Sequence, residues 1–556
     1  TLGNTGSSAS ASITIFSNAL LIIGNAIELA TGASGTLQLQ NGSSSAGSST
    51  TFSGAITGTN NLTIRNTSVG TLIFSGLINN AGTLTHISST GATGGATISG
   101  VIGSNVTGVI QNSSNNSSAL ILTNANNAYA GATTISAGTL ALSGSGTIAS
   151  SSGVSNSGNF DISATSSGAS VKTLTGAGTT ALGAKTLTVT AATGTLSGII
   201  SGTGGSIDIT AGNQVLSGAN TYSGGTTISG GILSISSGGV SGTNLSIGGV
   251  TISGGTLLLN TDGNTITNSI VLSFGTTNAI AASAGISATL GGVISGNNAS
   301  VIFGDSSNTG TIALTGANTF TGGTTIGGAT LVVSSGGDSD TNLSTGSVTI
   351  SGGTLLLNAT NTISNAIALS SGTINKIAVS AGLSATLSGV ISGSSASVIF
   401  GDSTHNGIIT LTRANTYSGG TTISGGTLRI SADTNLGVLP TSAVTNITMS
   451  NSSTLLISSQ SAPVTIHANR NIALGTGGGS ISNANTTYAV TIVGVISGVG
   501  NGLTINTGSN AGTVILAGAN TYSGSTTISG GTLQISVDAN LGTAPSSAST
   551  NITMNE

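Results

Sequence analysis

Charge is the property that this sequence has least of. Seven of its 556 residues are Lys or Arg and eleven are Asp or Glu, so charged residues make up 3% of the chain, against about 25% in ordinary globular domains. Proteins that bind nucleic acid or anionic lipid neutralise phosphates with clustered basic side chains. Seven scattered basic residues form no such cluster, and we expect no nucleic-acid partner.

Cysteine is absent altogether. This absence excludes disulfide bonds, zinc sites built on thiolates and catalysis by a thiol. It agrees with an extracellular protein that needs no redox control, although it does not establish one.

Long apolar runs are also missing. The most apolar segment, residues 18–30, is interrupted by Gly24, Asn25 and Glu28, and it falls short of the roughly 18 uninterrupted residues of a membrane helix. We interpret it as a strand and expect no transmembrane segment in this chain. The chain begins at Thr1 without a leader, which we interpret as a processed or excised start.

Glycine and short apolar runs are abundant instead. Glycine occupies 90 positions, which would destabilise helices heavily. Between the glycines lie runs of four to six residues rich in β-branched side chains, such as GTLLLN, GTIALTG and TTISGG. Such runs are typical of strands, so we expect an all-β fold with nearly no α-helix.

One phrase, GANTYSGGTTISGG at residues 218–231, recurs along the chain. Its aromatic position falls at Tyr129, Tyr222, Phe320, Tyr417 and Tyr522, which are 93, 98, 97 and 105 residues apart. A second phrase of the type TLSGVISG keeps step with it, and its glycines are Gly100, Gly198, Gly292, Gly389 and Gly494. Repeated blocks of about 97 residues indicate a repeat architecture.

A shorter period of about 24 residues lies inside each block. It places one isoleucine after another at Ile302, Ile326, Ile350, Ile374, Ile399, Ile423 and Ile447. Three short strands and their corners fill about 24 residues, which predicts one coil of a right-handed parallel β-helix, a β-solenoid. We expect the seven isoleucines to stack as one buried column, residues 1–90 to form divergent N-terminal coils, and residues 91–556 to form the blocks of about 97 residues, each of about four coils.

The recurring phrase itself predicts a corner of the coil. Asn220, Ser223, Gly224 and Gly225 are residues that adopt left-handed backbone angles or bond their own main chain, and we expect Tyr222 to cover the bend. We interpret the phrase as a recurring thick corner or local plug. A ligand site is the alternative.

The phrase GANTYSGGTTISGGTL, followed by DTNLGVLP up to Pro440 and DANLGTAP up to Pro545, resembles the passenger-associated repeat of bacterial autotransporters. That resemblance implies a secreted β-helical passenger, displayed on or released from a Gram-negative surface after export through an outer-membrane barrel. The sequence shows no signal peptide and no barrel strands after NITMNE. Display on the cell therefore stays open, and a cleaved passenger, a fragment or a relative with another route are the alternatives.

The acidic residues show no catalytic pattern. Asp305 and Asp402 occupy the same place in two copies of VIFGDS, as do Asp433 and Asp538 in the DTNLG and DANLG phrases. Residues duplicated with a scaffold are typical of corners, so we expect turn-capping carboxylates. The one local acidic pair lies in GGDSD at residues 336–340, where we expect a solvated loop rather than a calcium site.

The histidines are equally dispersed. His86, His405 and His467 lack the spacing of a metal site or a catalytic triad. His467 and Arg470 form the only basic cluster, which we expect to decorate a surface strand. We accordingly predict no catalytic, cofactor-binding or metal-binding residues and no cofactor.

These observations predict a non-enzymatic extracellular protein with a structural or adhesive role at a bacterial surface, a rod that binds host or matrix ligands. Self-assembly into a filament, sheet or matrix, end to end or side by side, is the main alternative, because a solenoid leaves strand edges at its ends. A polysaccharide lyase or hydrolase is the least favoured alternative, because the acids lie mostly one block apart.

Overall fold

The computed structural model describes residues 1–556 except residues 7, 33, 46, 90, 237–244, 246, 335–341, 546–549 and 556. The described residues contain no α-helix. Their helical segments are the 3₁₀-helices η2 (Asp433–Leu436) and η3 (Asp538–Leu541). The expectation of an all-β fold is confirmed.

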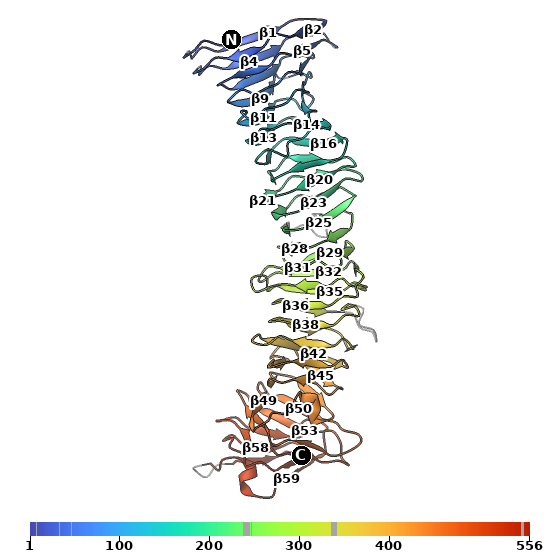
Figure 1. The fold of residues 1–556 in the computed structure, drawn as a ribbon. Helices are drawn as coiled ribbons and strands as arrows, with labels where there is room; N and C mark the ends of the chain where they lie inside the picture. Colours follow the sequence, from blue (N-terminus) through green and yellow to red (C-terminus); the bar gives the residue numbers. More distant parts are fainter. Residues whose placement is uncertain are drawn as a thin grey trace. The chain divides into compact units, whose positions relative to one another are not determined.

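The strands form a β-solenoid with about 24 residues per turn. The chain divides into two compact units, residues 1–271 and residues 272–556. Within each unit, strands stack on equivalent strands of the turns before and after them, and the pairings are parallel (Figure 1). Main-chain hydrogen bonds therefore run from turn to turn.

The first unit contains two long sheets and three smaller groups of strands. The strands of one long sheet are β1 (Ala11–Ile15), β4 (Leu37–Asn41), β7 (Leu62–Asn66), β9 (Thr83–Ser88), β11 (Gly108–Ser113), β13 (Ala132–Ala137), β15 (Val154–Asn156) and β18 (Leu174–Thr175). The strands of the other are β2 (Leu20–Ile23), β5 (Ser49–Phe52), β8 (Thr71–Phe74), β10 (Ala96–Ile98), β12 (Leu120–Leu122), β14 (Thr139–Gly144), β16 (Asn159–Thr165), β19 (Thr179–Ala181) and β22 (Ile200–Ser201).

The smaller groups of the first unit complete its turns. They are β3 (Ile27–Leu29) with β6 (Ile56–Gly58); β17 (Ala169–Val171), β20 (Thr186–Val189), β23 (Ser206–Ile209), β25 (Gly225–Ile228) and β27 (Val250–Ile252); and β21 (Ala192–Leu196), β24 (Gly212–Leu216), β26 (Ile232–Ile235) and β28 (Thr256–Leu259). Near the division lie β29 (Asn264–Ile266) and β30 (Ile270–Leu272).

The second unit repeats this arrangement. One face is built by β31 (Asn278–Ala282), β34 (Val301–Phe303), β36 (Thr324–Ile326), β38 (Val348–Ile350), β41 (Ile367–Leu369), β43 (Ile391–Gly393) and β46 (Thr416–Tyr417). A four-stranded sheet contains β51 (Val464–Ile466), β54 (Val490–Ile492), β57 (Thr513–Leu516) and β59 (Thr532–Gln534).

The other strands of this unit belong to one large sheet, apart from β33 (Ile294–Ser295). They are β32 (Ser287–Leu290), β35 (Thr311–Leu314), β37 (Thr330–Val333), β39 (Thr354–Leu357), β40 (Asn361–Ile363), β42 (Asn375–Leu387), β44 (Val398–Phe400), β45 (Asn406–Leu411), β47 (Thr421–Ile423), β48 (Thr427–Ile430), β49 (Val444–Met449), β50 (Ser453–Ile457), β52 (Arg470–Leu474), β53 (Gly479–Asn483), β55 (Ile496–Ser497), β56 (Leu503–Ile505), β58 (Thr526–Ile528) and β60 (Ile552–Met554).

Buried columns of apolar side chains fill the interior of each unit. In the first unit one column runs through Leu72, Ala96, Leu120, Leu140 and Phe160, each on the strand above the last. Alternate residues of the strands point outward, as the period of two along a strand requires. Each inward side chain thus packs against its equivalents in the neighbouring turns.

The isoleucine column predicted from the 24-residue period is wrong. Ile326 stacks on Ile350, but Ile302 pairs with Thr325 and Ile374 is 68% exposed. The chain places different residues in these columns, which are Phe303, Ile326, Ile350 and Leu369 in one set of turns and Phe400, Ile423, Met449 and Leu474 in another.

The error has a simple cause in the length of the turns. Ile399 pairs with Thr422, 23 positions later, and Thr421 pairs with Ile447, 26 positions later. A shift of one position turns a side chain from the interior to the outer face. The mean of about 24 residues therefore identifies the solenoid without fixing the column of any one residue.

Candidate functional site

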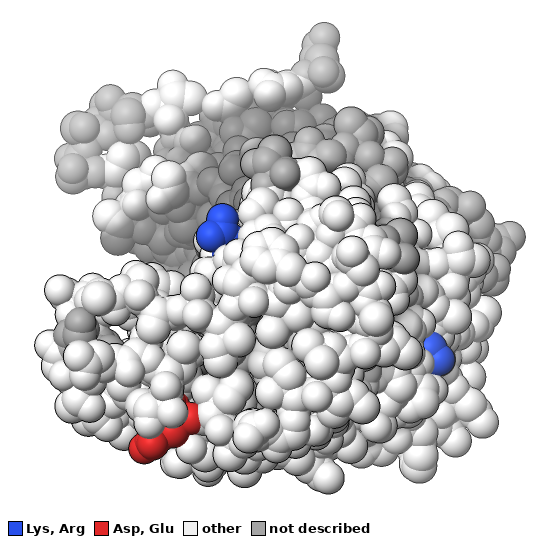
Figure 2. Space-filling view, turned by 90° about the horizontal axis from the view of Figure 1, so that it is seen from above, with Lys and Arg blue, Asp and Glu red and all other residues white. Residues whose placement is uncertain are grey.

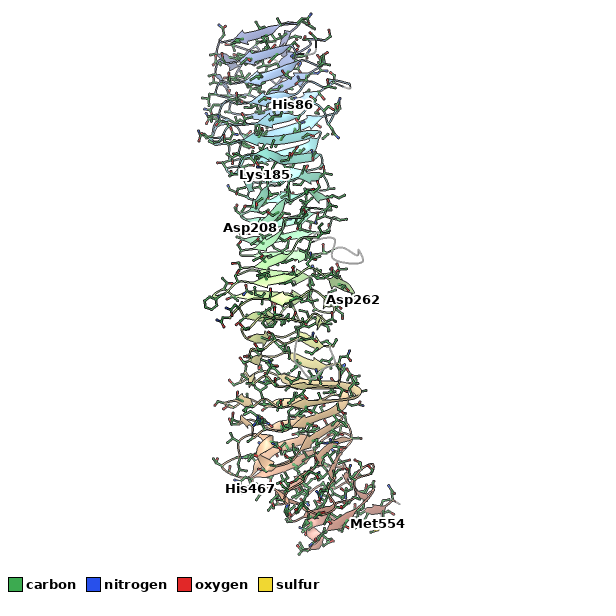
Figure 3. The ribbon with its side chains drawn as sticks, turned by 90° about the vertical axis from the view of Figure 1, so that its right-hand side faces the viewer. His86, Lys185, Asp208, Asp262, His467 and Met554 are labelled. Carbon is green, nitrogen blue, oxygen red and sulfur yellow. The ribbon has the colours of Figure 1, made fainter. Side chains whose placement is uncertain are left out.

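The titratable side chains do not gather into a reactive centre. Among the described residues no group of three or more His, Asp or Glu side chains could hold a metal ion. Lys185, Asp208 and Asp262 lie at separate levels of the first unit (Figure 3). Figure 2 shows one face on which the few charged side chains are isolated from one another. The predicted loop with Asp338 and Asp340 lies outside the described residues.

Asp305 and Asp402 cap turns, as the sequence predicts. Asp305 accepts hydrogen bonds from the backbone N–H groups of Ser307 and Asn308 at 2.7 and 2.9 Å, and the side-chain hydrogen bond from Asn308 is the main cause that lowers the pKa of Asp305. Asp402 accepts from the N–H groups of Thr404 and His405 in the same way. Both carboxylates stabilise the conformation of their own turn.

Asp402 also pairs with Lys376 of β42, and the imidazole Nδ1 of His405 lies 3.1 Å from the same carboxylate. Partial burial alone would raise the pKa of Asp402, but the hydrogen bonds from Lys376 and His405 hold it well below its usual range. A carboxylate with so low a pKa is a poor proton acceptor. The cluster joins two turns of the solenoid and lacks the chemistry of a general base.

The aromatic side chain of the repeated phrase is a plug inside the coil. All five aromatic positions have no exposed surface. The four tyrosines donate to or accept from a threonine hydroxyl four residues later, and the oxygen–oxygen distances are 2.7 Å for Tyr129, 2.6 Å for Tyr222, 2.8 Å for Tyr417 and 2.7 Å for Tyr522. Burial raises the pKa of Tyr222 and of Tyr417 to about 12, so these phenols stay neutral.

The third copy of the phrase has phenylalanine at this position. Phe320 is as buried as the tyrosines, and the hydroxyl of Thr324 has no hydrogen-bond partner there. The interpretation as a local plug is supported by this burial, whereas the expectation that Tyr222 merely covers a bend is wrong. Gly225, with a φ of 100°, does take the left-handed backbone angle expected of the corner.

The asparagine of the phrase explains why the two repeated phrases keep step. In every copy its side-chain oxygen accepts a hydrogen bond from the backbone N–H of the isoleucine in the second phrase, one turn earlier. The pairs are Asn127 with Ile102, Asn220 with Ile200, Asn318 with Ile294, Asn415 with Ile391 and Asn520 with Ile496, at 2.8–2.9 Å.

The same asparagine also donates to the turn that follows. The amide of Asn415 donates to the carbonyl of Asn435 at 2.6 Å, and the amide of Asn520 donates to that of Asn540 at the same distance. One buried side chain thus links three successive turns. The sequence predicted that Asn220 would bond its own main chain, and the constant offset of the two phrases was the signal for the longer-range bond.

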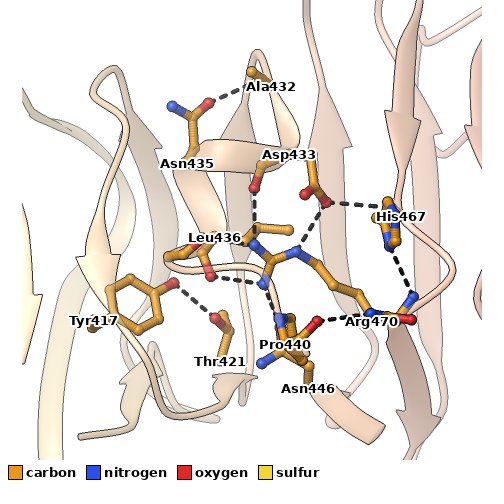
Figure 4. A network of polar contacts seen from close by, with 12 residues as sticks. Tyr417, Thr421, Ala432, Asp433, Asn435, Leu436, Pro440, Asn446, His467 and Arg470 are labelled. Carbon is orange, nitrogen blue, oxygen red and sulfur yellow. Dashed lines mark hydrogen bonds and ion pairs between the residues drawn. The ribbon is translucent and has the colours of Figure 1, made fainter. Parts of the chain in front are cut away.

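Arg470 is the most unusual side chain of the second unit, because a charged group of its size is fully buried. Its Nε donates to Asp433 Oδ1 at 2.9 Å, while its two terminal nitrogens donate to the carbonyls of Leu436 at 3.1 Å and Gly437 at 2.7 Å and to Asn446 Oδ1 at 2.5 Å (Figure 4). The expectation that Arg470 decorates a surface strand is wrong, although His467 is exposed. The guanidinium caps the C-terminal carbonyls of η2, which otherwise lack partners.

His86 is a buried imidazole in the first unit. Its Nδ1 lies 2.7 Å from Gln111 Oε1 and its Nε2 lies 3.1 Å from Asn66 Oδ1. Burial lowers the pKa of His86 to about 4, and the hydrogen bond with Gln111 opposes this shift. The neutral ring therefore belongs to a polar stack inside the coil, where it has access to neither solvent nor substrate.

Comparison with known proteins identifies the repeated phrase. Five segments, residues 115–142, 211–235, 307–333, 406–430 and 501–535, match the family model of the passenger-associated-transport-repeat. Each segment contains one asparagine, one aromatic plug and its threonine, so the resemblance seen in the sequence is confirmed. A search of curated proteins and a search of solved structures found no match.

The repeats imply a secreted or surface location for the chain. Within the described residues no helix is long and apolar enough to cross a membrane. The repeats and the solenoid are consistent with a non-enzymatic role.

The unpartnered hydroxyl of Thr324 generates a first prediction. Phe320→Tyr should place a phenol where the other four copies have one, and it should raise the local opening free energy of β36 by about 1 kcal/mol because a buried hydroxyl gains its partner. Hydrogen exchange of residues 324–326 measures this change. Phe303→Tyr, at a buried phenylalanine of the same unit, is the matched control and should destabilise. An equal loss in both variants would contradict the role of the tyrosine–threonine pair.

A second prediction concerns pH. Because the pKa of His86 is about 4 in the folded chain and 6.5 in the reference state, the unfolded chain takes up the proton first, so stability is complete above pH 6.5 and declines as pH falls toward 4. Between pH 7 and pH 5 the local opening free energy of β7, β9 and β11 should drop by on the order of 2 kcal/mol. Hydrogen exchange corrected for its intrinsic pH dependence measures the drop. The His86→Gln variant should lose most of this dependence, and an unchanged dependence would refute it.

Proposed function

We propose that this chain, which carries five passenger-associated-transport-repeats on a β-solenoid, is a non-enzymatic passenger scaffold at the exterior of a bacterium that acts in structure and adhesion. The single observation that carries the proposal is the recurrence of one buried lock, an asparagine with its aromatic plug, in every matched repeat. A lock repeated along the chain serves the stability of a long scaffold.

The outer faces support adhesion through uncharged polar contacts. Shallow hollows in both units are lined by glycine and small polar residues. One in the first unit includes Thr36, Asn60 and Thr83, and one in the second includes Ser452, Thr504 and Ser525. Such faces offer many hydroxyl donors and acceptors and almost no charge. Their natural partners are neutral polar surfaces, such as glycans or matrix proteins, and no cofactor is part of this proposal.

Self-association is the second candidate function, and one feature of the first unit favours it. Strands β1 and β2 are the end members of their sheets. Phe16, Leu20 and Ile22, in or beside them, are 73%, 79% and 72% exposed. An open strand edge with exposed apolar side chains favours pairing with another chain.

Binding of the purified chain to a glycan array and to immobilised matrix proteins tests the proposal. We expect binding that changes less than about twofold between 0.05 and 0.5 M NaCl, because the contacts carry little charge for salt to screen. Electron microscopy of the same sample, beside a Leu20→Asp/Ile22→Asp variant, tests the second candidate. Filaments present only in the unmodified chain would favour self-assembly, and an array without any bound ligand would contradict the adhesive role.

A further inference from the structure

Helix η3 in the second unit copies helix η2 in detail. The residue before each helix is extended, with φ and ψ of −155° and 156° at Ala432 and −145° and 156° at Val537. The residue after each helix is a glycine with a φ of 83° or 84°. Asn435 and Asn540 accept the same pair of backbone N–H groups at 2.9–3.0 Å. The two turns are therefore equivalent, 105 positions apart.

The first of these turns is completed by a guanidinium. Arg470 binds Asp433, the carbonyls of Leu436 and Gly437, and the side chain of Asn446. It does so from the start of β52, which pairs in parallel with β49. One arginine thereby satisfies a carboxylate, two helix carbonyls and an amide oxygen.

The second turn has every one of these acceptors. Asp538, the carbonyls of Leu541 and Gly542, and the side chain of Asn551 stand 105 positions after their counterparts. In the described part of the chain no side chain donates a hydrogen bond to these four groups, and Asp538 is exposed. Strand β60, the counterpart of β49, pairs with β58 alone among the described strands. The acceptors thus stand beside an unpaired strand edge.

We propose that the η3 turn is a receptor site for an arginine side chain, presented by a β-strand that pairs with the free edge of β60. The planar guanidinium fits a carboxylate and carbonyls that lie in one fork, which a point charge such as lysine does not match. Strand addition supplies the main-chain hydrogen bonds and the arginine supplies the selectivity. This inference stands independently of the adhesive function.

The site also selects against simple end-to-end stacking of two identical chains. The first turns of the chain, residues 1–64, contain no Lys and no Arg. A second copy that presents β1 or β2 to β60 would therefore bring no guanidinium. The ligand is a strand of different sequence, with an arginine at its start as in residues 464–474.

A synthetic peptide that contains residues 460–476 is the probe, and the same peptide with Arg470→Gln is its control. Binding of both to the full chain is measured by calorimetry at up to about 1 mM. We expect the arginine peptide to bind at least about tenfold more tightly and to protect the amides of β60 from hydrogen exchange. In the Asp538→Asn chain this preference should shrink to less than about threefold.

Asp433→Asn in the full chain is the matched control. Its site is already filled by Arg470, so the preference for the arginine peptide should be unchanged while exchange at β52 accelerates. Equal affinity of the two peptides, absence of binding by both, or protection outside η3 and β60 would overturn the proposal. Failure of the adhesion assay would leave these outcomes unaffected.

Discussion

Parallel hydrogen bonding between the main chains of successive turns is the constraint on which this structure depends. A strand in a solenoid has no partner within its own turn, so each turn is stable only against its neighbours. Once the register between two turns is set, every inward side chain lies over an equivalent one, and the interior becomes a set of columns. The scarcity of charge follows, because like charges stacked about 4.8 Å apart repel.

The repeated phrases strengthen this pairing where the chain turns. Asparagine side chains such as that of Asn415 bridge the turn before and the turn after, and the neighbouring aromatic ring fills the space between them. Arg470 performs a related task for η2, at the cost of burying a charge that needs all of its partners. These locks use polar groups inside the coil, in positions where an aliphatic side chain would leave backbone groups unpaired.

Much of the fold is predictable from the sequence, because glycine content, short β-branched runs and the period of about 24 residues each indicate a solenoid. The interior columns are not predictable in the same way. Ile374 and Ile326 obey the same period, yet one is exposed and the other buried, since turns of 19 to 27 residues shift the register. The buried position of Arg470 was equally hidden, because its acceptors lie 24 to 37 positions earlier. The asparagine locks were visible only as a constant offset between two phrases.

Disulfide trapping tests the register most directly, since the chain has no cysteine of its own. Thr410 and Arg429 face each other on β45 and β48, 19 positions apart. A chain with Thr410→Cys and Arg429→Cys should therefore cross-link in oxidising buffer, because paired positions lie within the span of a disulfide. A uniform turn of 24 residues would instead pair Thr410 with Thr434. Efficient cross-linking of Thr410→Cys with Thr434→Cys, and none with Arg429→Cys, would contradict the account.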